Sequence, residues 1–225
     1  DSSMKGDQLV GTIGNQSHLG GLLAIIQVFF FNNKLAFILL WILLILTKST
    51  SGIIVGIAVL LFYIFHKNRF WFKNLLGLSL IIGVIGIWKF GNFFTFSGRL
   101  ETWKVALEIF QKGQSQIIGL GLGSWSLLNI NFSPTAHWRH LHQEYFQFLL
   151  ECGIIGLLLI FWCIYDYFKT FNEHKDSLTI KIASIFFGFC ILAFFTFPAH
   201  LWLISLFGIL SYSLMYVIKK ENFQC

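Results

Sequence analysis

Residues 136–165 read AHWRHLHQEYFQFLLECGIIGLLLIFWCIY, a group of ionisable side chains followed at once by an apolar segment. The apolar segment, from about Tyr145 to Tyr167, is long enough to cross a bilayer as a helix, which takes roughly 20 residues. Three histidines, an arginine and a glutamate lie directly before or at its start. The stretch therefore predicts a membrane helix with ionisable groups at one end.

The composition of the whole chain agrees with a membrane protein. Of its 225 residues, 56% are hydrophobic and only 12% are charged, whereas about a quarter of a soluble domain is charged. The net charge of +6 is explained by short basic loops that set membrane topology, so we expect no nucleic-acid partner. The four cysteines match neither a zinc site nor a disulfide framework.

Six more apolar runs predict further helices, which makes the expected fold class an all-α polytopic transmembrane bundle. The polar stretch TKSTSG (residues 47–52) separates two of these helices, because its side chains are costly in hydrocarbon. The seven predicted helices are Leu19–Phe31, Leu35–Thr47, Gly52–Phe65, Asn74–Phe90, Tyr145–Tyr167, Ile180–Phe197 and Leu201–Ile218.

Basic residues orient this predicted bundle. The stretches NNK (32–34), HKNRFWFK (66–73), KTFNEHKDSLTIK (169–181) and KKEN (219–222) would lie on one side, which is cytoplasmic by the positive-inside rule. The long connection from Gly91 to His142 then lies outside the membrane. We expect a single membrane domain over residues 1–225, with residues 91–142 as its extracytoplasmic catalytic loop.

The connection is predicted to hold an amphipathic helix. SGRLETWKVALEIFQKG (97–113) places Leu100, Trp103, Leu107 and Phe110 at helical spacing. Ser97 is a candidate N-cap, and Gly113 a candidate stop signal. GLGLGS (119–124) would follow as a flexible turn.

The histidines next to the membrane helix are candidates for chemistry. Metal binding by His137, His140 and His142 with Glu144 is one interpretation, although their spacing matches no zinc signature and HExxH is absent. Acid–base catalysis is the other, because the pKa of a histidine lies near neutrality. Neighbouring cations would suit an anionic substrate. A serine hydrolase is disfavoured because GxSxG is absent.

Several motifs resemble those of the O-antigen ligase and polymerase superfamily. HQEYFQFLLECGIIGLLL (142–159) is similar to its H-N-x-Y-L-Q then E-x-G-x-x-G signature, with Gln143 in place of Asn. SGRLETWKVALEIF resembles its G-R-x-x-x-W segment, IIGLGLGSW its glycine turn, and GTIGNQSHLGGLLAI its G-T-x-G-N-x-N segment. LTKSTSGIIVGI falls where many members carry Ser-Arg-Gly.

The resemblance implies a membrane glycosyltransferase of the GT-C type. It would transfer or polymerise glycan repeat units from an undecaprenyl-pyrophosphate carrier onto an acceptor hydroxyl, without a metal or other cofactor. His142 would be the general base, and Arg99 would bind the pyrophosphate. Lys48 would stand in for a second arginine, without its bidentate fork. Arg139, His140, Trp103 and Glu144 are further candidates for substrate binding, and Glu144 could instead orient His142.

The resemblance also sets the expected context. Members have about twelve membrane helices, so the chain is expected to be the C-terminal portion of a longer protein. Its partners would be the lipid bilayer, the lipid-linked donor, a glycan or lipid acceptor, and other polysaccharide-export proteins. It would lie in the bacterial inner membrane with its site on the periplasmic face. Polymerase is preferred over ligase because the second arginine position is degenerate. A transporter or flippase, with the histidines as a proton relay, is the alternative of a different class.

Overall fold

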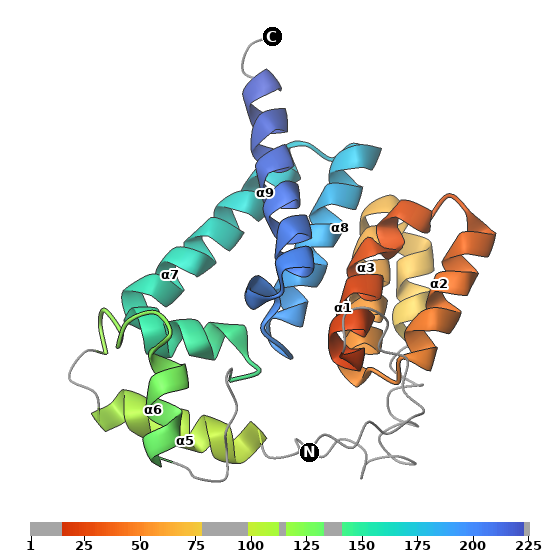
Figure 1. Ribbon diagram of the computed structural model, residues 1–225. Helices are drawn as coiled ribbons and strands as arrows, with labels where there is room; N and C mark the ends of the chain where they lie inside the picture. Colours follow the sequence, from red (N-terminus) through yellow and green to blue (C-terminus); the bar gives the residue numbers. More distant parts are fainter. Residues whose placement is uncertain (1–14, 78–98, 113–115, 133–140, 223–225) are drawn as a thin grey trace. The chain divides into compact units, whose positions relative to one another are not determined.

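The computed structural model describes residues 15–77, 99–112, 116–132 and 141–222, and over these ranges the chain is helical without a strand (Figure 1). This confirms the predicted all-α class. A further helical stretch covers 69–77. The other elements are α1 Gln16–Ile26, the 3-10 helix η2 Gln27–Phe30, α2 Lys34–Leu46, α3 Thr50–Lys67, α5 Arg99–Lys112, α6 Ser124–Phe132, α7 Glu144–Glu173, α8 Ser177–Leu192, the 3-10 helix η4 Pro198–His200 and α9 Trp202–Asn222.

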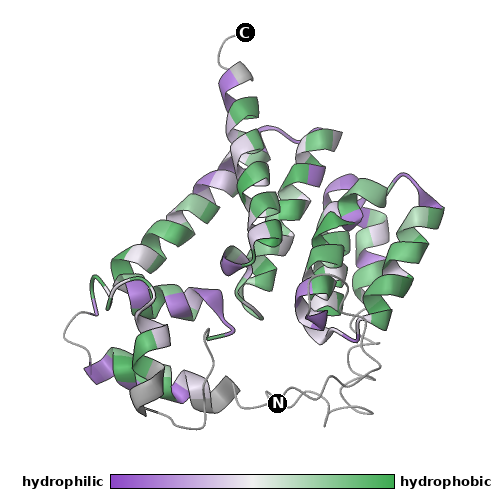
Figure 2. Cartoon of the chain, in the orientation of Figure 1, coloured by the Kyte–Doolittle hydropathy of each residue, from purple (hydrophilic) through white to green (hydrophobic). Residues whose placement is uncertain are grey.

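Three of the described helices are long and apolar enough to cross a membrane, namely Thr50–Lys67, Glu144–Glu173 and Trp202–Lys220. Shorter apolar helices cover Gln16–Phe30, Lys34–Leu46 and Ser177–Leu192, and hydrophobic residues run along most of α2 and α8 (Figure 2). The 13 residues of α2 measure about 20 Å at 1.5 Å per residue, less than the roughly 30 Å of the hydrocarbon core. The chain is an all-α membrane protein.

Several predicted boundaries were wrong for identifiable reasons. The basic stretch 66–73 is not a loop, because the Asn68 side chain accepts hydrogen bonds from the backbone N–H groups of Phe70 and Trp71 and starts a new helix. The predicted helix Ile180–Phe197 starts earlier, at Ser177, where the Asp176 side chain accepts from backbone N–H groups, and it ends at Leu192, after which the chain turns. Of the predicted helix Asn74–Phe90, only the start lies within the described residues. The predicted break between α2 and α3 is confirmed.

The chain divides into two compact units. The first unit holds residues 1–77, 170–192 and 198–225, and the second holds 78–169 and 193–197. In the first unit, α1 and α3 approach at their backbones: a Cβ added to Gly52 would lie 2.7 Å from the carbonyl carbon of Gly20. Small residues allow such close packing between membrane helices.

One buried polar side chain joins three elements of the first unit. The Gln27 amide donates to the carbonyls of Ala24 (2.7 Å) and Gly56 (2.8 Å), while its oxygen accepts from the Trp41 indole (3.2 Å). Gln27 is fully buried, and these bonds satisfy its amide where water is absent. The amide thus holds η2 against α2 and α3.

The second unit has a small core of its own. One buried cluster joins Ala106 and Ile109 of α5, Trp125 of α6, Leu150 of α7, and Leu141, which precedes α7. The amphipathic helix is therefore confirmed as α5: the predicted residues Trp103 and Phe110 pack on this cluster, whereas Leu107 is 45% exposed. Its predicted ends, at positions 97 and 113, lie outside the described residues.

The helix α7 is broken at Gly153, where the backbone adopts φ 70° and ψ −171°, and α7 changes direction there (Figure 1). The segment 116–121 replaces helical hydrogen bonds that are lost at the break. Its backbone N–H groups donate to carbonyls before the break, and its carbonyls accept from amides after it. The bonds are Leu120 N–H to Leu150 O (3.0 Å), Gly121 N–H to Glu151 O (2.9 Å), Ile154 N–H to Gln116 O (3.1 Å) and Ile155 N–H to Ile117 O (3.1 Å).

The start of the glycine turn at 119–124 packs against α7, a contact that the sequence did not predict. Gly119 has φ 80°, and a Cβ added to it would lie 2.3 Å from Glu151 O. A Cβ added to Gly153 would lie equally close to Ile117 O. Only glycine lets the two backbones approach in this way. The segment after the break, 154–173, is long enough to span the hydrocarbon core, which takes roughly 20 residues.

Candidate functional site

His142 lies just before α7 in a backbone conformation that residues other than glycine rarely adopt. Its φ is 55°, in the left-handed region that is uncommon for a residue with a Cβ. The next residue, Gln143, caps the helix, because its side-chain oxygen accepts a hydrogen bond from Phe146 N–H. The glutamine that departs from the family's asparagine thus performs the capping role that asparagine favours.

Both backbone polar groups of the residue before His142, its N–H and its carbonyl, form hydrogen bonds to side chains. The Trp103 indole of α5 donates to Leu141 O at 2.9 Å, and Leu141 N–H donates to the Gln147 side-chain oxygen at 3.2 Å. Leu141 itself is fully buried in the core of the second unit. We call Trp103, Leu141 and Gln147 the Leu141 clamp.

Two buried carboxyl groups lie on the first turns of α7. Glu144 is 3% exposed and Glu151 5%. Gln147 lies between them in the sequence, and its amide donates to Glu151 Oε1 at 3.1 Å. The Glu144 backbone N–H donates to Ala193 O at 2.8 Å. The clamp and this bond fix the backbone on both sides of His142, so the left-handed conformation is imposed by contacts with distant parts of the chain.

The His142 imidazole is half-buried and packs edge-on against Phe197, with 4.9 Å between the ring centroids. An imidazole can take a proton from a hydroxyl near neutral pH. An aromatic neighbour limits the ring's rotation without competing for its nitrogens. The arrangement suits a general base held just before the first part of α7.

Arg99 is the first residue of α5. It lies one helical turn before Trp103, so both positions occupy one face of the helix. The helix α5 thus carries both the Arg99 position and the indole that binds Leu141 O. Its role in pyrophosphate binding stays a prediction.

The remaining predicted site residues are distributed differently. Arg139 and His140 lie outside the described residues. Glu144 is buried, and Trp103 commits its indole N–H to Leu141. Lys48 is exposed, with φ 55°, between α2 and α3 of the first unit.

The sequence did not reveal the parts of this site that depend on backbone contacts. The motif includes Gln147 without indicating its role, and the meeting of Gly119 with Gly153 was not predicted. A glycine inside an apolar helix was the available signal, since such a residue often has a packing or functional reason.

The part of the chain that is similar to known proteins includes residues of this candidate site. Residues 35–161, more than half of the chain, match the family model described as O-Antigen ligase. A Rickettsia felis protein named "Putative polysaccharide ligase" is 34% identical over 89 residues, which cover 35% of this chain and 21% of that protein. The alignment thus spans about a fifth of that relative's length. No solved structure matches the chain.

Proposed function

The chain belongs to the O-antigen ligase family, and from this premise we propose that it works in a membrane glycosyltransferase. The donor is a glycan on undecaprenyl pyrophosphate, and the acceptor is a hydroxyl of a glycan or a lipid. The site faces the periplasm from the bacterial inner membrane, where other polysaccharide-export proteins are its partners.

In the proposed reaction, a His142 ring nitrogen takes the proton of the acceptor hydroxyl. The hydroxyl oxygen bonds to the anomeric carbon of the donor sugar, and the bond between that carbon and the pyrophosphate oxygen breaks. The electron pair leaves with the polyprenyl pyrophosphate, whose charge Arg99 stabilises. Pyrophosphate is a good leaving group, so a protein base and cations suffice without a metal.

The left-handed backbone at His142 is the observation that carries this proposal. Strained conformations persist only where the surroundings impose them, and they cluster at active sites. At His142 the Leu141 clamp and the Glu144 bond to Ala193 O impose it. The residue also precedes a helix that can cross a membrane. The part of α7 that is long enough to cross is 154–173, after the break, and a donor that keeps its polyprenyl chain in lipid would present its pyrophosphate near the end of that segment.

Substitution of His142 by alanine in the full-length protein tests the proposal. We expect surface polysaccharide assembly to fall about 10²- to 10⁴-fold, the usual contribution of a general base, with unchanged membrane insertion. His200→Ala, at the exposed turn η4, is the matched control and should leave assembly unchanged. Normal polysaccharide in the His142→Ala strain would refute the assignment.

The same experiment separates the two reactions of the family. Lipid-linked single repeats accumulate if the lost reaction is polymerisation. Finished chains remain on the carrier if it is ligation to an acceptor, the reaction named by the family description and by the Rickettsia felis relative. Failure to transport a solute, with normal polysaccharide, would favour a transporter.

A further inference from the structure

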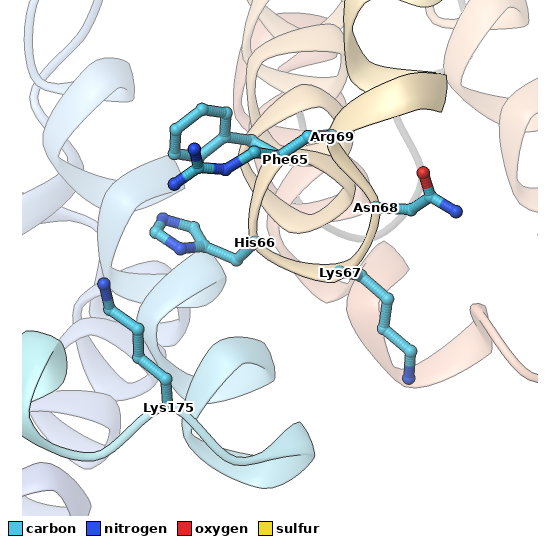
Figure 3. Close-up of a pocket in the computed structure, with 6 residues that line it drawn as sticks. All are labelled: Phe65, His66, Lys67, Asn68, Arg69 and Lys175. Carbon is cyan, nitrogen blue, oxygen red and sulfur yellow. The ribbon is translucent and has the colours of Figure 1, made fainter.

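A basic pocket lies at the C-terminal end of α3 in the first unit. Its volume is about 170 Å³, and residues of the α3 end, of the start of the helical stretch 69–77 and of the turn before α8 surround it (Figure 3). The lining residues are Phe65, His66, Lys67, Asn68, Arg69 and Lys175. Nothing in the proposed glycan transfer uses them.

Three of these side chains turn toward one another. Figure 3 shows the Arg69 guanidinium and the Lys175 ammonium on the same side of α3 as the His66 imidazole, while Lys67 and Asn68 point away from them. Lys67 reaches Ser177 Oγ at 3.5 Å. Two cations and an imidazole from separate segments thus gather around one small volume.

No carboxylate forms an ion pair with Arg69 or Lys175 in the part of the chain that the structure describes. Asp176 follows Lys175 in the sequence, but its Oδ1 accepts from the backbone N–H groups at positions 178 (2.7 Å) and 179 (2.8 Å) at the start of α8. The bond from position 179 is the main cause that lowers the pKa of this carboxyl. The positive charge of the pocket therefore lacks an ion-pair partner from the described chain.

The surroundings of the pocket favour a lipid over a free anion. The pocket lies at the end of a helix that is long and apolar enough to span a membrane. Phe70 and Trp71, which follow Arg69, are 69% and 58% exposed. Exposed aromatic rings beside cations are typical of the membrane–water interface. Basic pockets at helix ends bind lipid headgroups.

We propose that this pocket binds the phosphate of an anionic phospholipid headgroup. The Arg69 guanidinium forms paired hydrogen bonds to two phosphate oxygens, and Lys175 adds a second cation from the turn before α8. The acyl chains of the lipid lie against the exposed apolar side chains around the end of α3. The lipid then joins the end of α3 to the start of α8. This inference is independent of the proposed glycosyl transfer.

The test uses the full-length protein, purified and reconstituted in nanodiscs of phosphatidylcholine with or without about 20 mol% phosphatidylglycerol, an anionic fraction at which headgroup charge is felt. Bound phosphatidylglycerol is counted by native mass spectrometry after ejection from the disc. The pocket variant is Arg69→Gln with Lys175→Gln, whose side chains are exposed and whose loss spares the core. The matched control is Lys219→Gln with Lys220→Gln, two cations at the end of α9.

The expected result is a loss of about 30-fold in phosphatidylglycerol affinity for the pocket variant, since each cation near the headgroup contributes about 1 kcal/mol. The α9 control should keep the affinity of the unmodified protein. Arg69→Lys retains the charge but not the paired N–H donors of the guanidinium, and its affinity for phosphatidylglycerol should fall about 10-fold or less.

Two results would overturn the proposal. Equal losses in the pocket variant and the α9 control would mean that surface charge alone attracts the lipid. Inorganic phosphate that competes with phosphatidylglycerol at equal concentration would mean that the pocket takes a free anion rather than a lipid.

Discussion

Two helices of this chain are preceded by a residue with the same left-handed backbone conformation, and the conformation has a different cause in each case. Lys48 precedes α3 and His142 precedes α7, and both have φ 55°. Each is followed by a residue whose side chain caps the helix: Ser49 Oγ accepts from Gly52 N–H, and the Gln143 side chain accepts from the N–H group three residues on. A conformation that costs energy for any residue with a Cβ therefore occurs in each of the two units.

At Lys48 the conformation has a local cause. The residue lies just after the end of α2, and its N–H donates to Ile45 O at 2.9 Å. Thr47 Oγ1 accepts from Ser49 N–H at 3.2 Å, so every bond of this turn joins near neighbours. A left-handed residue just after a helix is a common way to end it. The turn explains the conformation of Lys48 without a function.

At His142 the cause lies elsewhere in the chain. Trp103 is 38 positions away from the residue whose carbonyl it holds, and Ala193 accepts from Glu144, another residue far from it in the sequence. Contacts of this kind cost conformational entropy to form. The comparison teaches that an unusual φ angle indicates function only when distant residues, and not the local turn, hold it in place.

The largest effect is expected from the contact between the broken helix and the glycine turn. Gly153→Ala forces a Cβ to within 2.3 Å of Ile117 O at a φ of 70°. We expect the free energy of unfolding to fall by about 3 kcal/mol or more, because strain and overlap add. Chemical denaturation in detergent measures the change.

Gly121→Ala is the control for that substitution. Gly121 also has a positive φ, 96°, but no atom lies within 4 Å of an added Cβ. The free energy of unfolding of Gly121→Ala should fall only by the backbone strain, about 1–2 kcal/mol. If the two variants lose equal stability, the segment 116–121 does not pack on the break as described.

A smaller effect is expected from the clamp itself. Gln147→Met keeps the size of the side chain and removes the acceptor for Leu141 N–H. We expect a loss of about 1–3 kcal/mol in stability, the cost of an unsatisfied buried donor. Glycan transfer should fall about 10-fold or more through kcat, since small misplacements of a catalytic group are costly.

The exposed Gln111 of α5 supplies the control for the clamp, and Gln111→Met should leave both stability and transfer unchanged. The shape of the pH profile should survive in Gln147→Met because the imidazole remains. Full transfer activity in Gln147→Met would show that the clamp does not position His142.

The distribution of apolar and polar residues along the sequence was enough to predict where several helices lie. The polar break at residues 47–52 and the helix α5 were both found in this way. The buried face of α5 was predicted only in part: Trp103 and Phe110 pack on the core as expected, but the fully covered positions are Ala106 and Ile109, and Leu107 is exposed. Which side of an amphipathic helix is covered depends on its neighbours, and a single sequence does not contain them.

The candidate site, too, was predicted from the sequence only in part. The histidines before a membrane helix were noticed for their chemistry, and His142 was chosen among them through the family's signature. The break at Gly153 was missed, since apolar residues flank it on both sides, at 149–150 and from 154 onward. Its cause is a pair of backbones that meet from segments about 35 residues apart, and backbone contacts leave little trace in side-chain patterns beyond the glycines.

The most direct test of the central claim replaces the left-handed residues by glycine, which adopts this conformation without strain. His142→Gly and Lys48→Gly should each keep or raise the free energy of unfolding by up to about 1 kcal/mol. Glycan transfer by the reconstituted full-length protein should be lost, by at least about 100-fold, in His142→Gly, and should fall far less in Lys48→Gly. Transfer that persists in a stably folded His142→Gly protein would contradict the claim that this imidazole is the base.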